Sequence, residues 1–323
     1  MTAHEIPVIN VAPFLAPNST QAERDAVVVQ VRDACRVYGF FQLEGHGISQ
    51  ELQDEVFRCA KTFFALPLEE KQKVGMHHAV GKSNRGYEMI GQQQLQYDAL
   101  PDYKEGIYIG AEIPPDDARA GKFLQGPNLW PASLPDETFR KPITQYRAET
   151  LELAHKLLRI LVLGLPYGAN VLEEFTFQPV ANIRLLHYPP QESTDQRHVG
   201  AGAHTDFGCI TLLLQEPDQT GLEVLYPPTN EWIPVPAVAG RYVVNIGDLL
   251  QGWTAGEYRS AMHRVRNLGG KDRYSIPFFY NGNMDFTLRP LDGSDDAHAI
   301  TVEQHIQNKF SASYSLKAQK GSA

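Results

Sequence analysis

The chain has 323 residues, 42% of them hydrophobic, and a formal net charge of −9 at pH 7. This acidic balance, without a long block of lysine and arginine, argues against nucleic acid or an anionic membrane surface as the main partner. The length allows one large domain or two ordinary ones, and the most apolar stretch, residues 157–165, is too short to span a bilayer.

Helices dominate the expectations for the first half of the chain. Apolar residues at helical spacing predict three helices, over residues 21–38, from Ser49 to about residue 65, and over 139–163. Short strands are expected over residues 6–10 and 40–43. The region 73–135 is rich in Gly, Pro, Gln and Asp, which predicts loops with short strands that could cover a site.

The pattern changes after Pro179, where short apolar runs alternate with turn residues. Strands are expected at residues 183–188, 210–215, 222–225, 242–246, 262–265, 274–280 and 286–289, and a last helix over 302–313. The chain is therefore mainly β with helical decoration, a jelly-roll-like barrel with an N-terminal α/β region. We expect residues 1–135 to form a helical and loop region that packs on a core of residues 136–323, the two making one compact unit.

Three residues in the β half form a candidate metal site. His204 and Asp206 are two positions apart, so on an extended backbone both side chains leave the same face. His263 comes from a later strand-like run, as is natural when ligands are supplied by different strands of one barrel. Two neutral imidazoles and one carboxylate with open positions are typical of non-haem Fe(II), and the open positions can take substrate and O₂.

A second pair of residues indicates a carboxylate-binding pocket beside the metal. Arg273 and Ser275 are two apart on one strand, and they offer a planar cationic fork and a hydroxyl on the same face. A dicarboxylate fits, with one end on Arg273 and a 2-oxo acid end on the iron, and Tyr188 could donate a further hydrogen bond. On spacing alone, a structural salt bridge from Arg273 to one of the protein's own acids stays open.

The substrate pocket is the least determined part. We expect Phe279 and Phe207 to form its walls, and Tyr87 or Glu88 to reach it from the loop region, although ordinary packing or surface positions explain these four residues equally well. The three cysteines show no metal-type spacing, and together with a non-secretory N-terminus they favour a reduced, cytoplasmic protein. The sequence leaves the oligomeric state open.

These motifs occur together in a family that the chain resembles over nearly its whole length. Ile6-Pro7-Val8-Ile9, Tyr38-Gly39-Phe40-Phe41, Gly45-His46-Gly47-Ile48, Phe63-Phe64 and Leu66-Pro67 precede His204-Thr205-Asp206, His263-Arg264-Val265 and Arg273-Tyr274-Ser275. The order is similar to that of the isopenicillin N synthase-like branch of the Fe(II)/2-oxoglutarate-dependent dioxygenases. The resemblance implies a double-stranded β-helix (cupin-like) fold, iron on His204, Asp206 and His263, and 2-oxoglutarate on Arg273, Ser275 and Tyr188.

The resemblance implies an enzyme that hydroxylates, desaturates or cyclises a small molecule, an activity suited to natural-product biosynthesis, with release of succinate and CO₂. Leu186 departs from the family pattern, because many plant members have Asn there. An oxidase of the isopenicillin N synthase type that does not consume 2-oxoglutarate remains an alternative, since such members keep the Arg-x-Ser pair. A non-catalytic metal-binding barrel is the third reading, but it would need four protein ligands and we find three.

Overall fold

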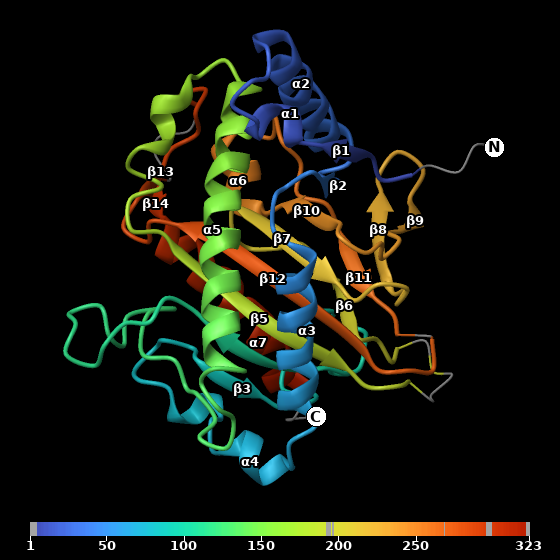
Figure 1. The fold of residues 1–323 in the computed structure, drawn as a ribbon, viewed down its shortest axis with the longest axis vertical. Coiled ribbons are helices and arrows are strands. Elements are labelled where there is room, and N and C mark those ends of the chain that lie inside the picture. The colour runs from blue at the N-terminus through green and yellow to red at the C-terminus, as the bar shows by residue number, and fades with distance from the viewer. Residues whose placement is uncertain (1–4, 192–194, 196, 268, 295–298, 321–323) are drawn as a thin grey trace.

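The computed structural model describes residues 5–191, 195, 197–267, 269–294 and 299–320. Two β-sheets form its centre, and helices cover the outside of the larger sheet (Figure 1). In spatial order, the larger sheet consists of β1 (Val8–Asn10), β2 (Phe40–Glu44), β10 (Tyr242–Ile246), β7 (Ile210–Gln215), β12 (Arg273–Gly282), β5 (Val180–Tyr188), β4 (Glu105–Ile109) and β3 (Gly86–Glu88).

The smaller sheet consists of β6 (Ala201–His204), β11 (His263–Val265), β8 (Leu222–Tyr226) and β9 (Glu231–Pro234), and a separate two-stranded ribbon pairs β13 (Thr287–Leu288) with β14 (Ile300–Thr301). Among the strand pairs of the described residues, only β1 with β2 is parallel. Two mainly antiparallel sheets with a cavity between them make the jelly-roll arrangement that the spacing of the turns predicted.

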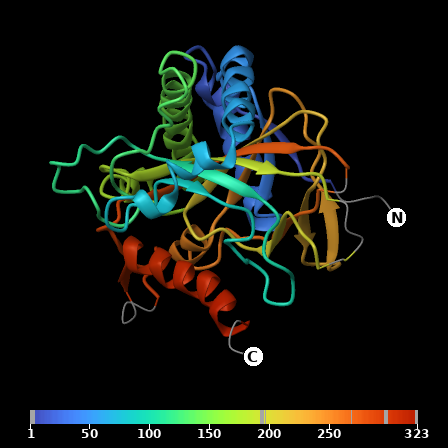
Figure 2. The same cartoon turned by 90° about the horizontal axis from the view of Figure 1, so that it is seen from below.

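The helices are α1 (Ala12–Leu15), α2 (Gln21–Val37), α3 (Gln50–Phe64), α4 (Leu68–Gln72), α5 (Arg140–Leu163), α6 (Asp248–Trp253) and α7 (Val302–Lys320), with 3₁₀ turns at Met76–His78 and Ala169–Leu172. Helices α3 and α5 cross the outer face of the larger sheet (Figure 1). Helix α7 lies on the other side of that sheet (Figure 2). No described helix is long and apolar enough to cross a membrane.

Local signals explain where the early helices begin and end. The backbone N–H of Leu52 donates to the Ser49 hydroxyl, so this residue caps α3 as expected. Helix α2 stops before Gly39, whose φ is +67° and whose added Cβ would lie 2.2 Å from the Arg259 carbonyl oxygen. Only glycine tolerates that conformation and that close approach, and the chain turns there directly into β2.

Alternation along β5 divides its residues between two environments. Ile183 and Leu185 belong to the hydrophobic cluster that also contains residues of α3 and α5. Asn182 and Arg184, which alternate with them, line the internal cavity. The helices therefore hold the larger sheet from outside, and its inner face is left to build a site.

Several predicted elements differ in extent. The last helix runs to Lys320 instead of residue 313, and the strand expected over 286–289 pairs only at Thr287–Leu288. The elements α4, α6, β6 and β9 were not predicted, because four to six residues are too few to show a helical or alternating period.

Candidate functional site

The structure brings His204, Asp206 and His263 together. His204 ends β6 and His263 begins β11, and the two residues face each other in the antiparallel register. The Nε2 atoms of both imidazoles lie 3.7 Å from Asp206 Oδ1. One ligand atom from each residue lies within 4.8 Å of the others, close enough for all three to bind one ion.

Backbone carbonyls orient both imidazoles. Nδ1 of His204 lies 2.7 Å from the Gly202 carbonyl oxygen, and Nδ1 of His263 lies 3.1 Å from that of Ala261. Because a carbonyl oxygen only accepts, each Nδ1 carries the proton and each Nε2 presents its lone pair toward Asp206. Burial lowers the pKa of His204 to about 4, with a further contribution from neighbouring His263, so the ring is neutral and can bind a metal at neutral pH.

Two hydrogen bonds orient the carboxylate. Asp206 Oδ2 accepts from Thr211 Oγ1 at 2.6 Å and from Asn245 Nδ2 at 2.7 Å, which leaves Oδ1 facing the imidazoles. Burial would raise the pKa of Asp206, but His263, His204 and these hydrogen bonds lower it below its usual value. The carboxylate is therefore ionised, and the donor set of two neutral nitrogens and one anionic oxygen fits Fe(II).

The three ligands open onto a cavity between the two sheets, with an empty volume of about 1090 Å³ that includes open solvent. Phe207 and Phe279, the two phenylalanines expected at the substrate pocket, line this cavity. Within the described part of the chain, no fourth His, Cys, Asp or Glu joins the group. The open space beside three ligands suits exchangeable ligands and differs from a closed structural metal site.

Arg273 points into the same cavity as a buried cation. It is 1% exposed, its Nη2 donates to Gln215 Oε1 at 3.0 Å, and its guanidinium lies 4.9 Å from the centre of the Tyr188 ring. Its Nη1 is buried without a hydrogen-bond partner. Burial lowers the pKa of Arg273, so the charge is disfavoured where it stands. Ser275 is also buried and lines the cavity.

The salt bridge that was an alternative role for Arg273 does not form among the described residues: no carboxylate there makes an ion pair with it. Arg273 is paired with Tyr188 across the β5–β12 ladder, so both side chains reach the cavity at one level. A guanidinium with a free donor, a phenol and a serine hydroxyl can bind a small carboxylate there.

Tyr87 and Glu88, expected to reach the pocket, do not line it. The Tyr87 hydroxyl donates to Glu105 Oε2 at 2.6 Å. Glu88 forms an ion pair with Arg184, and the arginine is the member of the pair that lines the cavity. Both residues belong to β3, the edge strand beyond β4, and each contacts a neighbouring side chain there, so their contact with substrate stays a prediction.

Sequence reasoning missed several polar residues of the cavity. Some of them could have been predicted, because residues two apart on a strand share a face. With Tyr188 in the cavity, Leu186, Arg184 and Asn182 of the same strand are expected to face it too, and Arg273 predicts Asn281 in the same way. Lys104 of the loop before β4, and Ile306 and Phe310 of α7, also line the cavity. No local pattern marks these three, because segments far apart in the chain bring them there.

Two family models match the chain. The N-terminal model of non-haem dioxygenases in morphine synthesis matches residues 6–133, and the model of the 2OG-Fe(II) oxygenase superfamily matches residues 179–282. The second match contains the His204, Asp206, His263 and Arg273 positions.

Relatives and solved structures agree with these matches. The chain is 46% identical over 309 residues to the 2-oxoglutarate-dependent dioxygenase tropC of Talaromyces stipitatus, covering 94% of each chain. It is 40% identical to the clavatol oxidase claD of Penicillium crustosum, covering 96% of this chain and 97% of the other. Its fold is similar to that of a full-length Neurospora crassa protein solved with alpha-KG and thymine, with a TM-score of 0.83, 28% identity and coverage of 95% and 96%.

Proposed function

The chain belongs to the isopenicillin N synthase-like branch of the Fe(II)- and 2-oxoglutarate-dependent dioxygenases, and from this membership we propose which of its residues perform that activity. The enzyme oxidises a small-molecule substrate with O₂ and 2-oxoglutarate, and it releases succinate and CO₂. His204, Asp206 and His263 hold the iron in this proposal. Arg273, Ser275 and Tyr188 hold 2-oxoglutarate.

The iron site is carried by one observation: three side chains from two strands and a loop present their ligand atoms to one point. When bound there, Fe(II) supplies the redox chemistry that activates O₂. The protein's own contribution is orientation, because Gly202, Ala261, Thr211 and Asn245 each direct a ligand atom inward.

The cosubstrate site is supported by the unpartnered donor of Arg273. A buried cation is stabilised by an anion, and a carboxylate at Nη1 would complete both the charge and the hydrogen bonding. In the alternative oxidase reaction a carboxylate of the substrate would satisfy Arg273 equally well. Use of 2-oxoglutarate is supported instead by the relatives, which are named 2-oxoglutarate-dependent dioxygenases.

We further propose that the primary substrate is a small, planar, uncharged molecule with hydrogen-bond acceptors. Lys104 and Arg184 also line the cavity, but Asp102 and Glu88 respectively neutralise their charges. Arg273 is therefore the cavity cation without an ion pair among the described residues, and 2-oxoglutarate takes that charge. The aromatic residues Phe207, Tyr108 and Phe310 add flat apolar walls, and the Neurospora crassa protein of similar fold has been solved with thymine and with 5-formyluracil.

The proposal also covers the cellular location and the domain organisation. We propose a cytoplasmic location, since all three cysteines are buried and unpaired, as in proteins of reducing compartments. We also propose that residues 1–135 and 136–323 act as one compact unit, because β1 to β4 of the first part extend the same sheet as strands of the second.

A substrate panel tests the proposed function. Anaerobically iron-loaded protein is mixed with 2-oxoglutarate, O₂ and neutral or anionic aromatic compounds, and succinate is followed by mass spectrometry. We expect succinate release to rise with neutral aromatic carbonyl compounds, and to be lost in His204→Ala. Turnover without succinate would favour the oxidase reaction, and equal turnover by His204→Ala would contradict the iron site.

A further inference from the structure

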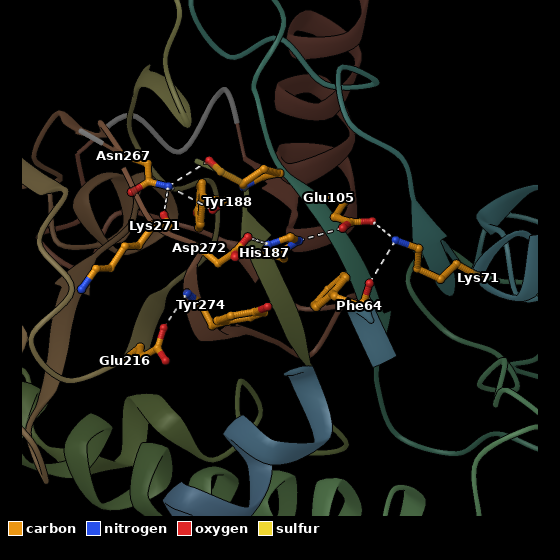
Figure 3. Close-up of polar contacts among 11 residues, drawn as sticks. Phe64, Lys71, Glu105, His187, Tyr188, Glu216, Asn267, Lys271, Asp272 and Tyr274 are labelled. Atoms are coloured by element: carbon orange, nitrogen blue, oxygen red, sulfur yellow. Dashed lines mark hydrogen bonds and ion pairs between the residues drawn. The ribbon is translucent and has the colours of Figure 1, made fainter. Parts of the chain in front are cut away.

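A network of charged and polar side chains, buried except at Asp272, lies behind the cosubstrate site on the outer face of the same strands (Figure 3). His187 Nδ1 lies 2.8 Å from Glu105 Oε1, and its Nε2 lies 2.7 Å from Asp272 Oδ1. Lys71 Nζ donates to Glu105 Oε2 at 2.8 Å. We call Lys71, Glu105, His187 and Asp272 the His187 network.

The hydrogen bonds of the network favour the ionised form of Glu105. Burial would raise the pKa of Glu105, but the hydrogen bonds from His187, Lys71 and Tyr87 lower it below its usual value. Both ring nitrogens of His187 lie within hydrogen-bond distance of a carboxyl oxygen, one on each side of the ring. Hydrogen bonds between ionised groups are stronger and more directional than neutral ones, so the network fixes the positions of its members.

Each of three network residues is the chain neighbour of a residue that lines the cavity. Glu105 follows Lys104, His187 precedes Tyr188, and Asp272 precedes Arg273. His187 and Tyr188 lie on β5 and point to opposite faces, and Glu105 and Asp272 contact His187 on the outer face. The network therefore holds from outside the backbone that presents Tyr188 and its neighbours inside.

The His187 network lies at one end of the β5–β12 strand pair. Arg273 is the first residue of β12 and Tyr188 the last of β5, and the two are paired. The ring of His187 also stacks on that of Tyr274, with centroids 4.8 Å apart and an interplanar angle of 14°. Asn267 Nδ2 joins the two strand ends through the carbonyls of Tyr188 and Lys271, at 3.0 and 2.9 Å. His187 is the member of the network that bridges β4, β5 and the start of β12.

We propose that His187 is a positioning residue for the cosubstrate site: clamped between Glu105 and Asp272, it holds Tyr188 and Arg273 where they bind 2-oxoglutarate. This inference rests on the proposed role of Arg273. Its effect is on affinity for 2-oxoglutarate, because the hydrogen bonds that join the network residues lead to the strand ends and not to the iron ligands.

The test replaces His187 with phenylalanine, which keeps a ring against Tyr274 and removes both polar contacts. Binding of 2-oxoglutarate to Fe(II)-loaded protein is measured by calorimetry without O₂, alongside the KM for 2-oxoglutarate, kcat and the melting temperature. Removing a residue that orients a metal ligand costs about 10- to 100-fold in affinity, and we expect an effect of that order for a residue that orients the cosubstrate site. We expect Kd and KM to rise at least about tenfold, with kcat at saturating 2-oxoglutarate within about twofold of the parent.

His155→Phe is the matched control. His155 lies on α5, its ring packs edge-on against Tyr280 on the outer face of β12, and its Nε2 has no hydrogen-bond partner. It should leave 2-oxoglutarate binding unchanged. Asp272→Asn, at a residue whose side chain is 54% exposed, removes one charge of the network with little risk to folding and should weaken binding in the same direction.

Unchanged Kd in both His187→Phe and Asp272→Asn would overturn the inference, as would equal losses in His155→Phe. If His187→Phe does not fold, Asp272→Asn decides. Arg273→Met, measured in parallel, separates this inference from the proposed function. Loss of binding in Arg273→Met alone leaves the cosubstrate site standing without the network, whereas normal binding in Arg273→Met contradicts the cosubstrate site itself.

Discussion

Replacing Arg273 with methionine should weaken 2-oxoglutarate binding and leave the metal-free protein as stable as before, or more stable. The guanidinium is buried, its Nη1 lacks a partner, and its Nη2 donates to the neutral side chain of Gln215. A buried charge without a countercharge destabilises the folded state until an anion binds. Methionine fills the space of the arginine stem without a charge.

The size of both effects follows from these contacts. A hydrogen bond to a charged group contributes about 1.5–3 kcal/mol, so losing a forked pair should cost about 3–6 kcal/mol, or roughly 100- to 10,000-fold in affinity. In the protein without 2-oxoglutarate, the substitution has two opposing effects on stability. Losing the bond to Gln215 and the contact with the Tyr188 ring destabilises the fold, whereas removing the buried charge stabilises it. Replacing buried ionic groups with apolar ones is often neutral or stabilising by about 1–4 kcal/mol, so the melting temperature should stay level or rise by a few degrees.

Calorimetric titration of 2-oxoglutarate and thermal unfolding of the metal-free protein measure the two effects. Arg147→Met is the control. Arg147 is also a cation disfavoured by burial, and its Nε and Nη2 donate to the Ala181 carbonyl oxygen at 3.3 and 3.1 Å, away from the cavity, so this change should leave 2-oxoglutarate affinity unchanged. If Arg273→Met binds 2-oxoglutarate normally and lowers the melting temperature, Arg273 is a structural cation.

Four further predictions concern other parts of the molecule. Asn245→Leu removes a hydrogen bond to Asp206 and should weaken iron binding about 10- to 100-fold in a metal titration; unchanged affinity would contradict the orienting role. Phe310→Ala should raise the KM for the substrate that the panel identifies but not the KM for 2-oxoglutarate, and equal changes in both would exclude a wall of the substrate pocket. Burial raises the pKa of Cys59 to about 12 and also raises those of the other two thiols, so a thiol reagent at pH 8 should label the unfolded chain and not the native one. Glu105 has a lowered pKa in the folded chain, so it stabilises above its unfolded pKa; Glu105→Gln should therefore lower stability at neutral pH, and the difference should shrink as the pH falls through the lowered value.

The parts of the site that could be predicted are pairs of residues close together in one segment of the chain. The spacing of Arg273 and Ser275 carries their geometry directly, because residues two apart on a strand share a face. The spacing of His204 and Asp206 also predicted their meeting, although Asp206 lies in the loop just after β6. The same rule, continued along β5, would have reached Arg184. Fold class followed from the spacing of turns, since short strands at regular intervals have few other solutions.

The other parts depend on contacts between distant segments. Phe310 lines the cavity because α7, from the far end of the chain, packs beside it, and its ring centroid lies 5.7 Å from that of Phe207. Tyr87 was expected inside and lies outside because the edge strand β3 presents it to Glu105. The orienting partners of Asp206 come from β7 and β10, and their roles depend on which strands are neighbours, a property that no single segment encodes.

The two faces of the larger sheet are energetically linked at the cosubstrate end. A strand cannot move Tyr188 without moving His187, and the residue that anchors His187, Glu105, is the neighbour of Lys104 in the cavity. Substitutions in the outer network should therefore change affinity for 2-oxoglutarate, although the network lies on the opposite face from it. Substitutions at Phe310, whose helix packs on the inner side of the sheet, should change affinity for the substrate instead (Figure 2). In the proposed function, substitutions in α7 therefore change the substrate pocket while the strand ends proposed to hold 2-oxoglutarate stay fixed.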